Sequence, residues 1–335
     1  MKLINKRSLT AICGVLVLAA CYITGFYYIS KYSSPNEIDS GEATKHYVAM
    51  ITKSTTSNFW KTVFAGANAA STEYNLTVTF EGPENEEDYE TQNQMIERAV
   101  ANEAEVIIFS AVDYKANAEA INQAAKQGVK IVVIDSAVNS DQISSIISTD
   151  NFEAGKMAGD AALACEDEVL NVGIVNFDKN SANGQQREEG FIERVSADPR
   201  VNIVETINVI STIEDSKEGA KELLRNHPEI NVIATFNEWT SLGVGYAIEE
   251  LELADSTAVV AFDSNVVSVG MLETGEVDAL IVQNPYAMGY LGVETAYNLI
   301  FNLAISETQV DTATTLVTRE NMYDDECQKV LFTFN

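Results

Sequence analysis

The sequence predicts an α/β protein in which two lobes, each built on a parallel sheet with helices on both faces, follow an N-terminal hydrophobic segment. From residue 46 onward, short apolar runs of strand length alternate with amphipathic helical segments. Strands that are apolar along their whole length are typical of parallel sheets with both faces covered. The alternation restarts once, and an apolar run closing in Asp-Ser occurs in each half, at Asp135-Ser136 and at Asp263-Ser264.

The length and charge of the chain narrow its possible functions. With 335 residues, the chain is long enough for about two domains with buried cores. Its formal net charge of -29 argues against nucleic-acid binding, which needs clustered Lys and Arg. The four cysteines and two histidines do not have metal-ligand spacing. We therefore expect no metal site and no cofactor.

The first 30 residues have the pattern of a targeting segment. Positive residues including Lys6 and Arg7 precede an uncharged apolar run from Leu9 to about Ile29, as in an export signal or a membrane anchor. Two alternatives stay open. Cys21 ends a lipobox-like Leu-Ala-Ala-Cys and can be the lipidated residue of a lipoprotein, or the whole run can be an uncleaved anchor. Residues 31–45 are polar and predict a linker outside the cytoplasmic membrane.

The body begins with four expected strands with helices between them, and a fifth strand then restarts the alternation. Gly82-Pro83 separates the second strand from the next helix, and Gly128 ends a later helix. The expected strands are residues 46–51, 76–80, 106–109, 131–134 and 143–148. The expected helices are residues 59–73, 89–101 and 116–127.

The second half repeats this alternation and ends less regularly. The turn Asn226-His227-Pro228 ends one helix. The expected strands are residues 169–175, 201–209, 232–236, 259–262 and 279–282. The expected helices are residues 151–165, 185–195, 214–225, 237–251 and 286–303. Two further strands are expected at residues 314–318 and Lys329–Phe334, and the helix at 286–303 can return to the first lobe.

The stretch Ala279–Gly289 predicts a crossing between the lobes. Asn284 can cap a helix, and Pro285 suits the first helical position, where its missing N–H is not needed. Gln283 is therefore left at the carboxyl end of a strand, where open α/β sheets bind ligands. The alternative is an ordinary strand-to-helix turn with a solvated Gln283.

Polar and aromatic residues gather at strand ends and helix starts along the chain. This mixture suits a polyhydroxylated ligand, because carboxylates accept hydrogen bonds from hydroxyls, amides donate and accept, and aromatic rings cover the apolar side of a sugar. Phe59 and Trp60 can instead be core residues, and the Asp and Asn residues can be helix caps. The set comprises Phe59, Trp60, Asp135, Gln185, Asn237, Asp263 and Gln283.

Catalysis is not expected from this sequence. His46 opens a strand and His227 lies in a turn, so neither belongs to the set above. Gly243-Val244-Gly245 falls inside a predicted helix and is not a dinucleotide loop, and the chain has no Walker motif.

These residues give the chain a family resemblance. Over about His46 to Asn321 it resembles the type 1 periplasmic binding proteins, in particular the ribose/galactose-type sugar-binding proteins of ABC transporters. No single motif is specific, but their order is. The motifs are Ser57-Asn58-Phe59-Trp60, Val133-Ile134-Asp135, Ser148-Thr149-Asp150-Asn151, Arg187-Glu188-Glu189-Gly190-Phe191, Phe236-Asn237-Glu238, Val260-Ala261-Phe262-Asp263, Val282-Gln283-Asn284-Pro285, Met288-Gly289 and Val317-Thr318-Arg319-Glu320-Asn321.

The resemblance implies two Rossmann-like lobes joined by a three-segment hinge, the periplasmic-binding-protein-like I fold. The first lobe would comprise residues 46–149 and 284–311, and the second 150–283 and 312–335. Hinge positions would be Thr149, Asp150 and Asn284. Cys165 and Cys327 would both belong to the second lobe, where a disulfide and free thiols are equally open.

The resemblance also assigns roles in ligand binding. Phe59 and Trp60 would stack on a sugar ring, and Asp135, Asn237, Asp263 and Gln283 would contact hydroxyls. Three departures from the family pattern stand out. Ser136, which is also among the expected ligand-binding residues, follows the first Asp where the family often has Arg. Gln185 stands where a ligand-contacting Arg is frequent, so Arg187 is interpreted as structural. The aromatic residue often found in the second lobe is replaced near Ser211.

Two functions follow from the resemblance. The first is an extracytoplasmic, membrane-tethered solute-binding protein that delivers a small sugar-like ligand to an ABC permease. The alternative is a ligand-sensing subunit of the same fold that presents sugar to a membrane histidine kinase, which an uncleaved anchor would favour. Either protein would sit at the outer face of the cytoplasmic membrane. A transcription repressor of similar fold is disfavoured by the hydrophobic N-terminus.

Overall fold

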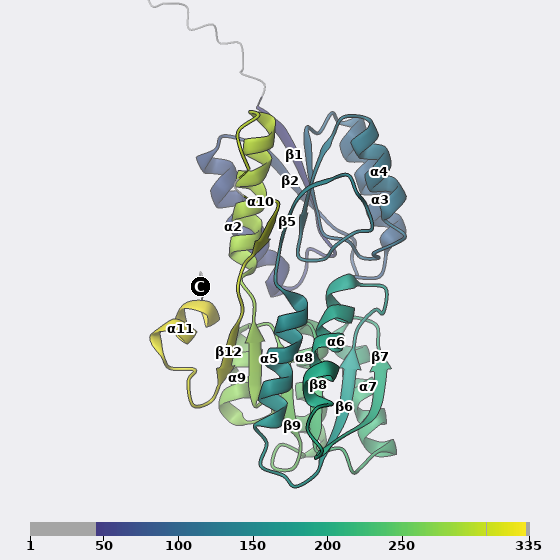
Figure 1. Ribbon diagram of the computed structural model, residues 1–335, viewed down its shortest axis with the longest axis vertical. Coiled ribbons are helices and arrows are strands. Elements are labelled where there is room, and N and C mark those ends of the chain that lie inside the picture. The colour runs from purple at the N-terminus through teal and green to yellow at the C-terminus, as the bar shows by residue number, and fades with distance from the viewer. Residues whose placement is uncertain (1–44, 306, 333–335) are drawn as a thin grey trace, which may run out of the picture. The chain divides into compact units, whose positions relative to one another are not determined.

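The computed structural model describes residues 45–305 and 307–332, and the two lobes belong to the same unit of the chain. This unit contains two six-stranded sheets, one in each lobe (Figure 1). The first sheet has the strand order β11-β5-β4-β3-β1-β2 and the second β12-β10-β9-β8-β6-β7. The predicted α/β class with two largely parallel sheets is therefore confirmed.

The bounds of the strands agree with the predicted runs to within a few residues. The strands of the first sheet are β1 (Tyr47–Ile51), β2 (Thr77–Glu81), β3 (Val106–Phe109), β4 (Lys130–Ile134), β5 (Ile143–Ser148) and β11 (Gln309–Asp311). Those of the second are β6 (Leu170–Asn176), β7 (Val201–Asn208), β8 (Val232–Thr235), β9 (Ala258–Phe262), β10 (Ala279–Val282) and β12 (Thr315–Thr318). The sequence pattern did not reveal β11.

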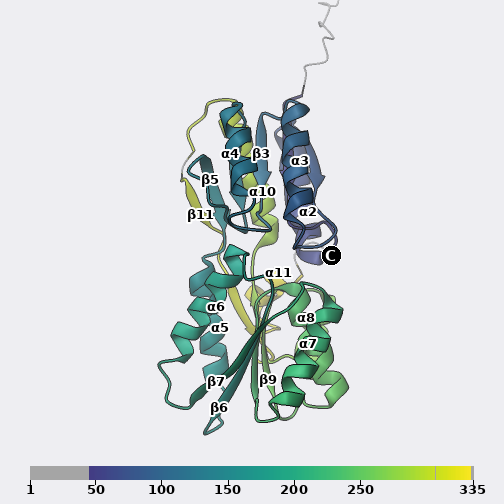
Figure 2. The same ribbon diagram turned by 90° about the vertical axis from the view of Figure 1, so that its right-hand side faces the viewer.

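Helices cover both faces of each sheet. The first lobe carries α2 (Asn58–Glu73), α3 (Tyr89–Ala101), α4 (Ala118–Lys126) and α10 (Pro285–Ile300). The second carries α5 (Asn151–Leu163), α6 (Ala182–Val195), α7 (Ile213–Asn226), α8 (Glu238–Leu251), α9 (Val266–Thr274) and α11 (Asp325–Leu331). Figure 2 shows α5 and α6 on one side of the second sheet and α7 and α8 on the other.

Alternating side chains of the buried strands supply a core on each face of a sheet. In β1, Val48 and Met50 pack towards α2 and α10, whereas Ala49 and Ile51 pack towards α3 and α4. Successive residues of a strand point to opposite faces, so a strand covered on both sides has to be apolar throughout. This is the physical reason that continuous apolar runs predicted the sheets.

The chain crosses between the two sheets three times within the described residues. The crossings are residues 149–150 between β5 and α5, 283–284 between β10 and α10, and 312–314 between β11 and β12. The helix that follows the second crossing packs on α2 and so returns to the first lobe, as expected. The three-segment hinge is confirmed, whereas the residue bounds of the lobes stay a prediction.

The close approach of α10 to α2 depends on glycine. A Cβ atom at Gly289 would lie 1.9 Å from the carbonyl oxygen of Val63, and one at Gly66 would lie 2.1 Å from that of Tyr286. Both distances are far inside van der Waals contact. The helix that carries the second crossing is thus held directly against the first lobe.

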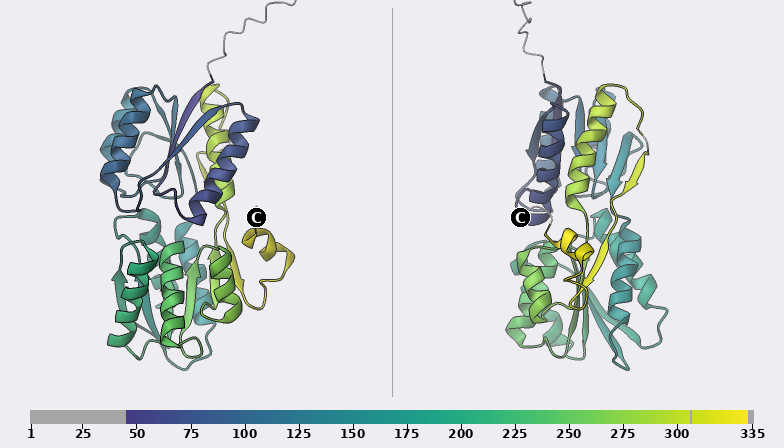
Figure 3. Two further views of the ribbon diagram at one scale, coloured as in Figure 1. Left: turned by 180° about the vertical axis from the view of Figure 1, so that it is seen from behind. Right: turned by 90° about the vertical axis from the view of Figure 1, so that its left-hand side faces the viewer.

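Two sequence expectations need correction near the C-terminus and in the second half. The strand expected at Lys329–Phe334 is wrong, because α11 runs helically to Leu331 and buries Cys327 and Leu331, four residues apart on one helix face. Figure 3 shows α11 at the level where the chain crosses between the lobes. The sequence pattern also missed α9, whose cap is Asn265.

The two cysteines in the described part of the chain are free thiols. Cys327 packs with the core on the α7–α8 face of the second sheet, and Cys165 packs against the core on the α5–α6 face. The sheet lies between them, so the disulfide alternative is not found.

The expected signal or anchor at residues 1–30, the lipidation residue Cys21 and nearly all of the linker lie outside the described residues. None of the helices among the described residues is long and apolar enough to cross a bilayer.

Candidate functional site

Two aspartates follow equivalent strands of the two sheets and face the cleft between the lobes. Asp135 follows β4 with φ 55°, and Asp263 follows β9 with φ 67°, so both lie in the left-handed region. The Asp135 N–H donates to the carbonyl of Ile147 over 3.1 Å, and the Asp263 N–H donates to that of Ile281 over 3.0 Å. Each aspartate is thus fixed to the neighbouring strand that leaves for the other lobe.

The side chains of both aspartates are buried and hydrogen-bonded. The hydroxyl of Ser110 donates to Asp135 over 3.0 Å, and the Asn183 amide reaches across from the second lobe to both of its carboxylate oxygens over 3.1 and 3.2 Å. The amide of Gln283 donates to Asp263 over 2.7 Å. Asp263 does not cap the next helix, since Asn265 does.

Arg187, which the sequence analysis interpreted as a structural residue, lines the cleft and contacts several of its groups. It is 1% exposed, and its guanidinium donates to Asn151, to the carbonyl of Phe236 and to Gln283 over 2.7–2.8 Å. It also stands 4.7 Å above the ring centroid of Phe262. The buried face of α6 carries Asn183, Arg187, Gly190 and Phe191. That helical spacing was the sequence signal for Arg187.

Burial sets the ionisation of this cluster. Removal from water raises the pKa of Asp263 to about 7, although Arg187 and the Gln283 hydrogen bond act in the opposite direction. Burial also raises the pKa of Asp135, against the pull of Lys53 and Arg187. The pKa of Arg187 is lowered by the same loss of solvation. The charges of Asp135, Arg187 and Asp263 are therefore coupled to one another in a cleft with little water.

Gln283 joins the hinge to the cleft. It is buried, and its Oε1 accepts hydrogen bonds from Thr149 over 2.9 Å and from Arg187 over 2.7 Å. Its amide nitrogen donates to Asp263. The residue at the predicted crossing thus contacts another crossing segment, the central cation and one carboxylate.

Phe59 and Trp60 belong both to the core of the first lobe and to the wall of the cleft. Their rings meet edge to face with centroids 5.0 Å apart. The two interpretations of these residues therefore do not exclude each other. Phe177 and Trp239 add aromatic rings from the second lobe, so that lobe has aromatic cover although Ser211 is not aromatic.

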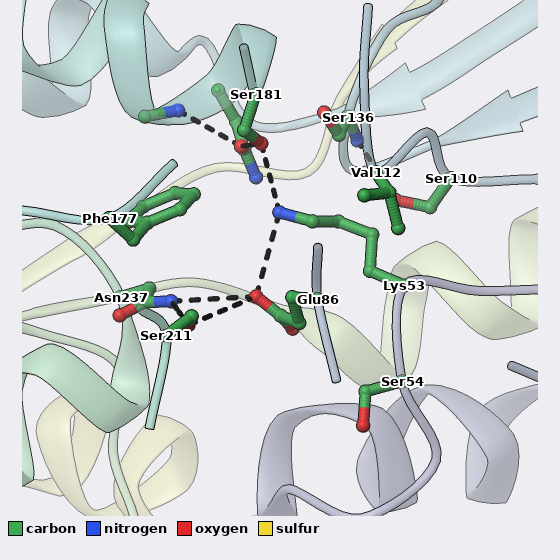
Figure 4. A network of polar contacts seen from close by, with 12 residues as sticks. Lys53, Ser54, Glu86, Ser110, Val112, Ser136, Phe177, Ser181, Ser211 and Asn237 are labelled. Atoms are coloured by element: carbon green, nitrogen blue, oxygen red, sulfur yellow. Dashed lines mark hydrogen bonds and ion pairs between the residues drawn. The ribbon is translucent and has the colours of Figure 1, made fainter. Parts of the chain in front are cut away.

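A polar network that the sequence did not reveal occupies one part of the cleft (Figure 4). Lys53 lies two residues after β1, and Glu86 lies in the loop between β2 and α3. Their charged groups are 3.6 Å apart. Asn237, which caps α8 as one interpretation proposed, also donates to Ser211 over 2.7 Å within this network.

The remaining predicted residues lie at the margins. Ser136 is buried and does not line the cleft, and its hydroxyl has no hydrogen-bond partner among the described residues. Gln185 lies one turn into α6, half-buried and outside the cleft lining. Asp150 and Asn284 cap α5 and α10, where the chain leaves the crossings.

The cleft is closed by direct contacts between the lobes. Its side chains leave a free volume of about 20 Å³, which is room for about one water molecule. In the described residues, no group of three or more His, Cys, Asp or Glu is placed to hold a metal ion. What the site offers is a dense set of hydrogen-bond donors and acceptors with aromatic walls.

Comparisons with known proteins agree with this geometry. The profile of the family described as "Periplasmic binding protein domain" matches residues 48–302. The ribose import binding protein of Bacillus subtilis is 20% identical over 296 residues, which cover 88% of this chain and 93% of that protein.

Two solved structures have the same fold. A carbohydrate transporter solute-binding protein from Agrobacterium radiobacter, in complex with D-arabinose, superposes with a TM-score of 0.84 and 31% identity over 86% of this chain and 99% of that chain. An ABC transporter solute-binding protein from Agrobacterium vitis with bound D-fucose gives a TM-score of 0.82 and 27% identity over 85% and 99%. Fold, cleft and profile together show that the chain belongs to the periplasmic binding protein domain family.

Proposed function

We propose that this chain is an extracytoplasmic, membrane-tethered solute-binding protein. It captures a small, sugar-like ligand between its two lobes and delivers it to the permease of an ABC transporter. The observation that carries the proposal is the convergence of carboxylate, amide, guanidinium and aromatic groups from both lobes in one buried cleft. The relatives named above, whose descriptions specify sugars or sugar import, support the same ligand class.

The chemistry of the cleft suits a polyol. Asp135 and Asp263 can each accept from two neighbouring hydroxyls, and the guanidinium of Arg187 can donate to their oxygens. Phe59 and Phe177 present apolar surface to the C–H side of a ring. A ligand that lacks one of these hydroxyls would leave a buried polar group unpaired, so the site would discriminate strongly between sugars.

Binding requires the lobes to move. The space lined by Asp135, Arg187 and Asp263 has no room for a sugar, and the bond from Asn183 to Asp135 joins the two walls directly. We infer that the lobes open about the three crossings, that ligand hydroxyls replace these direct contacts, and that the lobes then close over the ligand. The donors and acceptors now paired across the cleft are the groups that would bind the ligand.

The location of the protein is part of the proposal. Residues 1–30 would hold it at the outer face of the cytoplasmic membrane, either as an uncleaved anchor or through a lipid on Cys21. The body from His46 onward would then stand outside the membrane, where it can meet its ligand and the permease. It would act by binding alone, without catalysis.

Calorimetric titration against a panel of sugars tests this function. The full-length chain would be purified in a detergent without a sugar head group and titrated with D-ribose, D-arabinose, D-fucose, D-allose and D-galactose. We expect one or more to bind with 1:1 stoichiometry and to raise the unfolding temperature. If none of the panel gives heat or stabilisation at millimolar concentration, the proposed function is wrong.

A further inference from the structure

The Lys53–Glu86 ion pair is a second pair of charges in the cleft, and it interacts electrostatically with the Asp135–Arg187–Asp263 cluster. Lys53 is 2% exposed and Glu86 7% exposed, and both side chains line the same cleft. An ammonium and a carboxylate are costly to bury unless each is compensated. Their position in the cleft wall indicates a role towards the ligand.

Lys53 and Glu86 both come from the first lobe, but groups of the second lobe complete their surroundings (Figure 4). The Lys53 ammonium donates to the Ser181 hydroxyl over 2.9 Å and stands 4.8 Å from the ring centroid of Phe177. These partners separate when the lobes open. The free hydrogen-bonding capacity of the ammonium then faces the entering ligand.

The two oxygens of Glu86 differ in how well they are bound. Its Oε1 accepts a bond of 2.8 Å from the indole nitrogen of Trp60, in the same lobe. Its Oε2 has only long contacts, at 3.4 Å from Ser211, 3.5 Å from Asn237 and 3.6 Å from Lys53. Hydrogen bonds at these lengths are weak. The Glu86 carboxylate is therefore anchored through Oε1 and only weakly bound through Oε2, on the side towards the second lobe.

We propose that the Lys53–Glu86 pair determines the charge of the ligand and selects an uncharged one with an acceptor oxygen beside a hydroxyl donor. The proposal rests on the proposed function and names the ligand class of that same site. The ammonium donates to the ligand's acceptor oxygen, and the weakly bound Glu86 oxygen accepts from the neighbouring hydroxyl. Each charge stays compensated by its partner while a neutral ligand is bound.

A charged ligand breaks this compensation. A ligand carboxylate at this position has to compete with Glu86 for Lys53 and leaves two carboxylates facing each other. A ligand amine has to compete with Lys53 for Glu86 and leaves two cations. In a cleft closed to water, like charges repel strongly, so both ligands are rejected. Removing one member of the pair should therefore open the site to one sign of charge.

The test compares charged and neutral sugars that share one ring configuration. D-Galactose and D-fucose are the neutral probes, D-galacturonate carries a carboxylate, and D-galactosamine carries an amine. The full-length wild type is expected to bind the better neutral probe at least about tenfold more tightly than either charged one. Glu86→Gln should raise the affinity for D-galacturonate, relative to that for the neutral probe, by about tenfold or more. Lys53→Met should raise the relative affinity for D-galactosamine by the same factor.

Control variants separate this effect from misfolding. The double variant Lys53→Met/Glu86→Gln has no charge at this position, so it should still fold and should gain affinity for neither charged sugar. The surface pair Lys221–Glu250, with its groups 2.7 Å apart, offers a matched control. Lys221→Met should leave every affinity unchanged.

The outcomes are distinguishable from those of the function test. The inference is overturned if the charged-to-neutral affinity ratios of both single variants stay within about threefold of wild type. It is also overturned if wild type binds a charged probe better than both neutral ones, in which case a solute-binding role stands with another ligand class. If no sugar of either set binds wild type, the proposed function and the inference fall together.

Discussion

The hydroxyl of Thr149 donates a hydrogen bond of 2.9 Å to Oε1 of Gln283, which joins two of the three crossings between the lobes. The same oxygen accepts from Arg187, and the amide nitrogen of Gln283 donates to Asp263. A rotation about the crossings therefore acts directly on the groups that we expect to bind ligand. Hinge and site share one hydrogen-bond network rather than two.

Asp263→Ala is expected to weaken ligand binding. The substitution removes an acceptor of ligand hydroxyls and leaves the Gln283 amide without its acceptor, whereas Arg187 keeps its ion pair with Asp135. Hydrogen bonds to charged groups contribute about 1.5–3 kcal/mol, so the affinity for the best sugar of the panel should fall by about tenfold to a hundredfold. Titration calorimetry measures this loss, with exposed Asp255→Ala as the control. Unchanged affinity would remove Asp263 from the site.

The raised pKa of Asp263 predicts a pH dependence of stability. Its pKa is about 7 in the folded protein and 3.8 as an unperturbed group, so the folded state holds this proton more tightly. The free energy of unfolding should then fall as the pH rises from about 4 to about 7, by up to about 1.4 kcal/mol per pH unit, and stay lower above that range.

Asp263→Asn removes the titrating group and tolerates the same backbone conformation. The unfolding temperature of Asp263→Asn minus that of wild type should therefore be larger at pH 8 than at pH 5. Scanning calorimetry of both proteins at the two pH values makes the comparison. An equal difference at both would contradict the assignment of the shift to Asp263.

Glu238→Gln is expected to loosen lobe closure. The Glu238 carboxylate, at the start of α8 in the second lobe, accepts from the backbone N–H groups of Asn58 and Phe59 at the start of α2 over 3.3 and 2.9 Å. It thus supplies a negative charge to the N-terminus of a helix in the other lobe, an interaction worth up to about 2 kcal/mol. Amide exchange at residues 57–60 should become faster in the unliganded variant, whereas exposed Glu249→Gln in the same helix should leave it unchanged.

Gly289→Ala is expected to destabilise the first lobe. The new methyl group would meet the Val63 carbonyl oxygen at 1.9 Å, so α10 and α2 must separate. Overpacking of this kind costs about 1–3 kcal/mol, which urea unfolding can measure. Gly270→Ala in α9 meets nothing within 4 Å and should be neutral or slightly stabilising. Similar unfolding midpoints for the two variants would show that the helices separate at little cost.

The sequence predicted the parts of this protein that follow from local pattern. The sheets could be predicted because strands such as β3 and β4 are buried on both faces and therefore apolar throughout. The equivalent positions of Asp135 and Asp263 in the two lobes could be predicted because each aspartate directly follows such a strand. Asn284 and Pro285 marked the start of α10, since caps depend on neighbouring residues alone.

What could not be predicted depends on contacts between distant segments. Glu86 lies within an acidic stretch that has the pattern of a solvated loop, and only the packing of Trp60 and Lys53 against it shows otherwise. Gln185 was favoured because it stood at the expected start of a helix, but α6 begins three residues earlier, at Ala182. Arg187 lies two residues beyond Gln185 and therefore on another face of the helix. The end of α11 was taken for a strand because residues 330–334, Val-Leu-Phe-Thr-Phe, are apolar and β-prone.

The backbone of the two cleft aspartates also shows what ligand recognition demands of the scaffold. A side-chain-bearing residue with positive φ is strained, whereas glycine adopts the same conformation freely. Glycine at positions 135 and 263 would relieve that strain but would leave the buried Arg187 without a carboxylate partner. We therefore expect the double glycine variant to lose heat resistance together with all sugar affinity, so that the scaffold tolerates these two strained residues because the buried cation requires their charges.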